Sequence, residues 1–137
     1  RIREANDGAV ALEQINTHLI DIIIADYALT TINGIELTEL LRGAEDSYNR
    51  FVPVIMLSAY TEKWRIEAAR DAGVTEFLQK PLCANDLYLR LLEVIERPRR
   101  FVRSGRYFGP DRRRHLKGQF KGLDRRGPDE HDVTPGT

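Results

Sequence analysis

The sequence predicts a doubly wound α/β fold, in which a parallel sheet carries helices on both of its faces. Short apolar runs alternate along the chain with longer segments whose apolar residues recur at helical spacing. Two of the runs, DIIIAD and FVPVIMLSA, are apolar almost throughout, which is typical of strands covered on both sides. Strands joined by single helices form right-handed crossovers and therefore a parallel sheet.

Four strands and four helices are expected in residues 1–96. The strands are expected at RIREA, DIIIAD, FVPVIMLSA and TEFLQKPL, which are residues 1–5, 21–26, 51–59 and 75–82. Pro81 cannot donate a ladder hydrogen bond and should end the last of them. The helices are expected at residues 9–19, 34–46, 62–73 and 84–96, and Pro98 bars continuation of the last.

Charge divides the chain into a body and a tail. The formal net charge is zero, but residues 97–137 carry twelve basic and five acidic residues, while residues 1–96 carry nine basic and sixteen acidic ones. This asymmetry predicts an acidic domain over 1–96 and a basic Arg/Gly-rich tail over 97–137. Because Gly, Pro and charged residues dominate the tail, we expect it to be irregular and flexible.

The single cysteine, Cys83, cannot form an internal disulfide. The sequence also shows no signal peptide and no long apolar span. These observations favour a cytoplasmic protein with no membrane contact.

Three polar side chains stand at the ends of predicted strands: Asp26, Ser58 and Lys80. In open parallel sheets, ligands bind beyond the carboxyl ends of the strands. Taken singly, the aspartate could cap a turn, the serine could lie in a turn and the lysine could be a solvated surface residue. Their shared position favours one chemical site.

The ordered set IIIAD, NG, VPVIMLSA and DAGVTEFLQKPL resembles the receiver domain of bacterial response regulators, the chemotaxis-type phosphoacceptor, over residues 2 to about 96. The resemblance implies a flavodoxin-like fold and a switch that signals by protein contact, with no role as an enzyme. It implies that Asp26 accepts a phosphoryl group from a histidine kinase or phosphotransfer protein. Ser58 and Lys80 match the residues that meet the phosphoryl oxygens, and Phe77 matches the aromatic whose rotamer follows the hydroxyl residue.

The same resemblance implies a Mg²⁺ cofactor, held by Asp26, the backbone carbonyl of Ala28 and an acidic pair at the end of the first strand. This sequence lacks that pair. RIREANDG matches the second strand of the family and its following turn, so the first strand and first helix are absent. The expected fold is therefore an N-terminally truncated receiver.

Three explanations of the truncation stay open. In the first, the chain is a fragment. In the second, it is complete and rearranged, either with the strand of Ile2 beside that of Asp26 or with a partner chain in the gap. In the third, it is a degenerate receiver. A degenerate receiver would act without phosphorylation, as an interaction or scaffold module that uses its basic tail. A haloacid-dehalogenase-type phosphatase is disfavoured, because its second aspartate would fall at Ala28.

The tail contains an internal echo, FGPDRRR at 108–114 and FKGLDRRG at 120–127. It could be a solvated extension, or it could dock on the acidic body or on a partner protein. Nucleic acid is the less expected partner, because Asp111 and Asp124 lie beside the arginines. We expect Trp64, Arg65 and the neighbourhood of Phe77 to form the output surface. A homodimer through the helix over 84–96 is an option.

Overall fold

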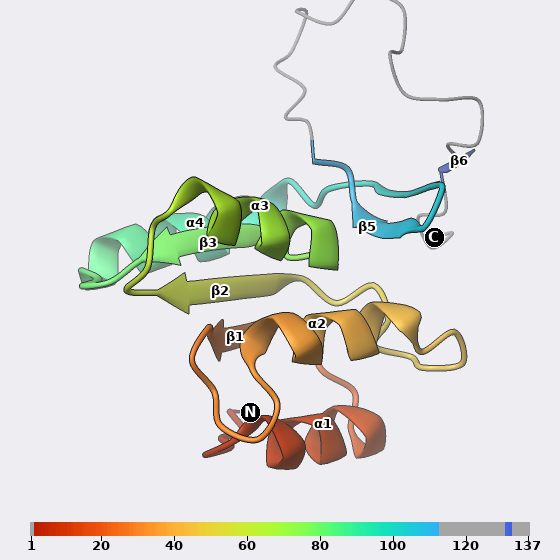
Figure 1. Cartoon of the computed structure of the whole chain (residues 1–137), viewed down its shortest axis with the longest axis horizontal. Helices are drawn as coiled ribbons and strands as arrows, with labels where there is room; N and C mark the ends of the chain where they lie inside the picture. Colours follow the sequence, from red (N-terminus) through yellow and green to blue (C-terminus); the bar gives the residue numbers. More distant parts are fainter. Residues whose placement is uncertain (1, 113–130, 133–137) are drawn as a thin grey trace, which may run out of the picture.

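A computed structural model describes residues 2–112 and 131–132 (Figure 1). The elements are α1 (Gly8–Thr17), β1 (Ile23–Asp26), α2 (Gly34–Gly43), β2 (Val54–Ser58), α3 (Lys63–Ala72), β3 (Glu76–Gln79), α4 (Ala84–Glu96), β4 (Phe101–Ser104), β5 (Tyr107–Pro110) and β6 (His131–Asp132). The helices match the predicted ones, except that α1 and α2 end two and three residues early.

The body is built on a parallel three-stranded sheet in the order β1-β2-β3. The arrowheads of all three strands point the same way in Figure 1, so their carboxyl ends share one edge. Leu37 and Leu41 of α2 and Ala69 of α3 pack with the buried side chains of one face, whereas Val94 of α4 packs with those of the other. The predicted doubly wound arrangement is confirmed.

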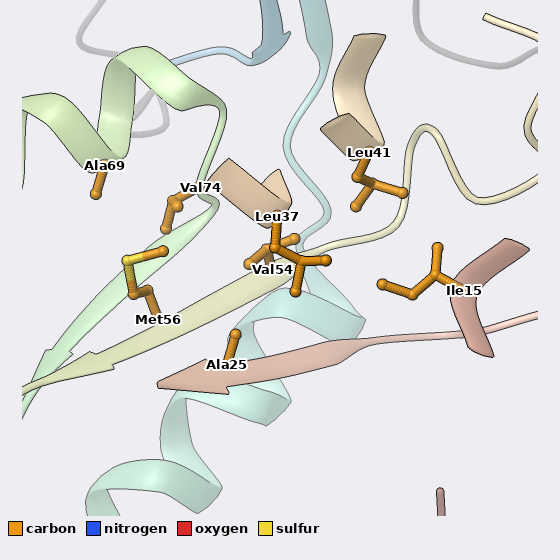
Figure 2. Close-up of a cluster of buried hydrophobic side chains, with 8 residues drawn as sticks. All are labelled: Ile15, Ala25, Leu37, Leu41, Val54, Met56, Ala69 and Val74. Carbon is orange, nitrogen blue, oxygen red and sulfur yellow. The ribbon is translucent and has the colours of Figure 1, made fainter. Parts of the chain in front are cut away.

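Figure 2 shows the larger core cluster, in which side chains from three helices meet the sheet. Met56 is fully buried at its centre, and the cluster comprises Ile15, Ala25, Leu37, Leu41, Val54, Met56, Ala69 and Val74. The alternation along β2 explains the two cores, since Val54 and Met56 face this cluster while Ile55 faces the smaller one on the α4 side.

The strand expected at residues 1–5 is wrong. Residues 2–6 adopt no regular structure, and Ile2 is 88% exposed. Within the part of the chain that the structure describes, β1 pairs only with β2, so the rearrangement that sets Ile2 beside the strand of Asp26 does not form. The physical reason is that residues 2–6 have no neighbouring strand to complete their backbone hydrogen bonds.

The side chain of Asn49, in the loop before β2, holds the C-terminal end of α1 through hydrogen bonds. Its side chain is buried, and Nδ2 donates to the carbonyl oxygens of Ile15 and His18 at 2.6 and 2.7 Å. Its Oδ1 accepts from the backbone N–H of Ile20 at 3.0 Å. One amide side chain therefore completes the hydrogen bonding where α1 turns into the segment leading to β1.

The prediction of an irregular tail is wrong for residues 101–110. β4 and β5 form an antiparallel hairpin, with Gly105 at φ +58° in its turn, and β6 pairs with the other edge of β4. Phe101 and Phe108 pack on Phe51 of the body, with ring centroids 5.1 and 5.6 Å away. The hairpin is stable because it buries these rings against the body.

The hairpin lies at the end of the sheet opposite the strand arrowheads (Figure 1). Arg112 pairs with Asp71 of α3, and Arg99 lies 3.4 Å from Glu76 of β3. This part of the basic tail therefore docks in cis on acidic groups of the body, one of the options that the sequence left open. The second half of the internal echo, at 120–127, lies outside the described residues. Across the residues described, no helix is both long and apolar enough to cross a membrane.

Candidate functional site

The structure brings Asp26 and Lys80 together at the carboxyl edge of the sheet. Asp26 is the last residue of β1, and Lys80 directly follows β3. The Nζ of Lys80 donates to Oδ2 of Asp26, in an ion pair that joins the two outer strands across the end of β2. Both side chains remain more than a third exposed, so the pair is accessible to a ligand.

The environment of Asp26 favours its ionised form. Partial burial alone would raise the pKa of the carboxyl group. The hydrogen bonds from Lys80 and from the backbone N–H of Ala28, together with the charge of Lys80, outweigh burial and lower the pKa below its ordinary value. Asp26 is therefore an accessible carboxylate beside a cation, which is the ionisation state that a carboxylate nucleophile requires.

Ser58 ends β2 between the two charged residues. Its hydroxyl is buried and accepts a hydrogen bond from the backbone N–H of Tyr60 at 2.9 Å. Its carbonyl oxygen accepts from the backbone N–H of Lys80 at 2.8 Å, which fixes the start of the loop after β3. The hydroxyl is thus engaged with Tyr60 in this structure, and an approach to Asp26 would require that bond to break.

The start of α2 packs closely against the backbone of Asp26. Asn33 caps the helix, accepting from the N–H of Glu36 at 2.8 Å while the Glu36 side chain accepts from the N–H of Asn33. A Cβ at Gly34 would lie 2.8 Å from the carbonyl oxygen of Asp26, so glycine is required for this close approach. Asn33 therefore caps α2, and Gly34 allows the close approach to Asp26.

Two tyrosines lie at the site that sequence reasoning did not single out. Tyr27 follows Asp26 and Tyr60 lies two residues after Ser58, and their rings pack edge to face at 6.1 Å. The guanidinium of Arg65 stacks on Tyr60 at 4.3 Å and on Trp64 at 4.4 Å, and it donates to the hydroxyl of Tyr27 at 3.1 Å. The available signal was an aromatic residue one position after Asp26 and another two positions after Ser58.

Phe77 of β3 is half-buried and packs against the larger core cluster. Ala28 contributes its backbone N–H to Asp26.

The described residues do not by themselves fit Mg²⁺. This cation is usually bound by one or two carboxylates together with water and phosphate oxygens, in a nearly octahedral arrangement. Among residues 2–112 and 131–132, no group of three or more histidine, cysteine, aspartate or glutamate side chains could hold a metal. Lys80 already pairs with one oxygen of Asp26. A complete site needs further acidic groups.

A family model described as the response regulator receiver domain matches residues 1–92. The chain belongs to this family. Chemotaxis protein CheY-3 of Vibrio cholerae is 30% identical to it over 95 residues, which cover 69% of this chain and 72% of the relative. The transcriptional regulatory protein PdtaR of Mycobacterium tuberculosis is 33% identical over 86 residues, covering 63% of this chain. That match spans only 40% of the length of PdtaR.

A solved receiver structure shows the same fold. The receiver domain of sensor histidine kinase PA1611 from Pseudomonas aeruginosa superposes with a TM-score of 0.63 at 28% identity, covering 70% of this chain and 77% of that one. That structure is described with a magnesium ion coordinated in the active site cleft. The flavodoxin-like receiver fold predicted from the sequence is therefore confirmed, and so is a place in two-component signal transduction.

Proposed function

We propose that this receiver is a phosphoacceptor switch, phosphorylated on Asp26 by a histidine kinase or phosphotransfer protein and signalling through protein contact. The observation that carries the proposal is the ion pair between Asp26 and Lys80 at the carboxyl edge of the sheet. It combines an ionised carboxylate with a cation able to neutralise the oxygens of an incoming phosphoryl group.

The proposed reaction uses the free carboxylate of Asp26 as nucleophile. One of its oxygens attacks the phosphorus of a phosphohistidine; the phosphorus–nitrogen bond breaks, its electron pair goes to the imidazole, and an acyl phosphate forms. The ammonium group of Lys80 then leaves the carboxylate oxygen and pairs with a phosphoryl oxygen. Attack of water on phosphorus returns Asp26 as a carboxylate and releases inorganic phosphate.

The proposed switch begins at Ser58. A phosphoryl group on Asp26 offers a new acceptor to the buried hydroxyl, which now accepts from the N–H of Tyr60. Turning toward the phosphoryl group would free that N–H and displace the ring that stacks on Arg65. Trp64 is 59% exposed beside them, so the change would reach a surface that a partner can contact.

Mg²⁺ is the proposed cofactor, since it supplies positive charge to a transferring phosphoryl group. Asp26 and the carbonyl of Ala28 would hold it together with acidic groups from outside the described residues. We further propose a cytoplasmic location and a role as a switch more than as an enzyme, although the domain would catalyse its own phosphorylation and hydrolysis.

A second candidate function is a receiver that binds partners without phosphorylation. The specific observation in its favour is that the described residues include no group of three or more histidine, cysteine, aspartate or glutamate side chains that could hold a metal. In that case the pair of Asp26 and Lys80 would be a structural ion pair that joins the ends of β1 and β3.

Intact mass spectrometry after incubation with acetyl phosphate and Mg²⁺ separates the two functions. The tested proteins are this chain, its Asp26→Asn variant and, where the gene encodes residues before Arg1, a version that includes them. The proposal expects one phosphoryl adduct that hydroxylamine removes and that the variant lacks. If a folded, Mg²⁺-binding version takes up no phosphoryl group, the second candidate function replaces the first.

A further inference from the structure

A groove between α2, α3 and the C-terminal hairpin has no role in phosphoryl transfer. It has a volume of about 550 Å³, and its lining runs from Ile35 at the start of α2 to Phe108 of the hairpin. We call it the arginine groove, because four arginines line it among three carboxylates and one aromatic ring: Arg42, Arg50, Arg103, Arg106, Glu39, Glu45, Asp71 and Phe108.

Arg42 of the groove lining is a buried cation that forms no ion pair within residues 2–112. Arg42 is 3% exposed, and it donates only to backbone carbonyl oxygens, through Nε to Gly73 and through Nη1 to Arg50 and Val52. Its Nη2 has no hydrogen-bond acceptor among the residues described. Burial lowers the pKa of Arg42 to about 9. A buried charge in this state favours an anion nearby.

The walls of the groove add three further arginines, Arg50, Arg103 and Arg106. Arg50 and Arg103 lie over the ring of Phe108, with guanidinium carbons 3.7 and 5.1 Å from its centroid. No ion pair within residues 2–112 involves these two, Arg42 or Arg106, whereas Asp71 is engaged by Arg112. Burial lowers the pKa of Arg50 and the neighbouring charge of Arg103 lowers it further, while the charge of Glu45 opposes the shift. The guanidiniums are thus held close together despite their repulsion.

From this arrangement we propose that the arginine groove binds an acidic segment of a partner protein. A stacked guanidinium presents its N–H donors in one plane, the geometry that pairs with a carboxylate through two hydrogen bonds. The proposed docking needs no phosphoryl group, because the groove lining includes neither Asp26 nor Lys80.

Single-stranded nucleic acid fits the groove less well. Base binding needs a free aromatic face, but Phe108 is 8% exposed, and its surroundings are two guanidiniums and the rings of Phe51 and Phe101. Glu39 and Glu45 would also repel a uniformly charged phosphate chain.

Fluorescence anisotropy with a short labelled peptide rich in Asp and Glu tests the proposal. The decisive variant is Arg103→Gln combined with Arg106→Gln, since neither side chain holds a hydrogen bond to the body in the described structure. Each removes one charged contact, so the affinity should fall about tenfold in total. Glu45→Lys should strengthen binding about threefold by removing repulsion and adding a cation.

The matched control is Arg125→Gln combined with Arg126→Gln, which removes the same charge from the tail. Equal or larger loss in this control would overturn the proposal, because the tail would then carry the binding. An unlabelled oligothymidine that displaces the peptide more effectively than unlabelled peptide would overturn it in favour of nucleic acid. Unchanged affinity in the Arg103/Arg106 variant, with an unchanged urea midpoint, would also refute it.

Discussion

Replacing Phe101 with alanine tests whether the C-terminal hairpin is part of the cooperative fold. Phe101 is 5% exposed, and its ring contacts Phe51 at 5.1 Å, Phe108 at 5.6 Å and the guanidinium of Arg42 at 4.7 Å. Burying about 200 Å² of phenylalanine at about 25 cal/mol per Å² gives roughly 5 kcal/mol, of which alanine retains a part. Allowing for the cavity, Phe101→Ala should cost about 3–5 kcal/mol.

Urea unfolding followed by circular dichroism measures this free energy. A loss of this size is a large share of the 5–15 kcal/mol that is typical of domains, and it should lower the melting temperature by roughly 10–20 °C. Tyr48→Ala is the control, because Tyr48 is 84% exposed and its loss should change stability by less than about 0.5 kcal/mol. A cost below about 1 kcal/mol for Phe101→Ala would refute the reasoning, since the hairpin would then contribute nothing to the stability of the body.

Three further substitutions test other links. Asn49→Ala leaves three backbone groups near α1 without their partner and should cost about 2–4 kcal/mol in the free energy of unfolding by urea; a loss within about 0.5 kcal/mol would contradict the role assigned to it. Gly34→Ala should cost about 1–3 kcal/mol in the same assay, because its Cβ meets the carbonyl oxygen of Asp26, and an unchanged midpoint would show that the loop adapts. Lys80→Met should raise the pKa of Asp26, measured by NMR titration of its carboxyl carbon. The folded pKa of Asp26 is depressed, so its stabilising contribution is lost as pH falls, and this loss should shrink in Lys80→Met; an unchanged pKa would contradict the cause assigned to the shift.

The sequence was sufficient to locate the candidate site because strand ends can be read from apolar runs. Asp26, Ser58 and Lys80 each terminate such a run, and parallel pairing brings their positions to one edge. The sequence could not show that the hydroxyl of Ser58 accepts from Tyr60, because that bond depends on the conformation of the loop after β2.

Contacts between distant polar and aromatic residues were beyond sequence reasoning. Asn49 reads as a loop residue, yet it holds groups that lie about thirty positions earlier in the chain. The hairpin was missed because its two strands have four residues each, lie in an arginine-rich segment, and become stable only when Phe101 and Phe108 meet Phe51. The strand expected at residues 1–5 does not form, although its pattern is apolar enough, because none of the described strands pairs with it.

Peptide mapping after borohydride trapping tests the central claim most directly. Borohydride reduces an acyl phosphate of aspartate to homoserine, so it marks the residue that carried the phosphoryl group. After treatment with acetyl phosphate and Mg²⁺, the account predicts homoserine at position 26 and aspartate at the neighbouring Asp21. Homoserine at Asp21 or another position, with Asp26 unmodified, would contradict the assignment of Asp26 as the phosphoacceptor.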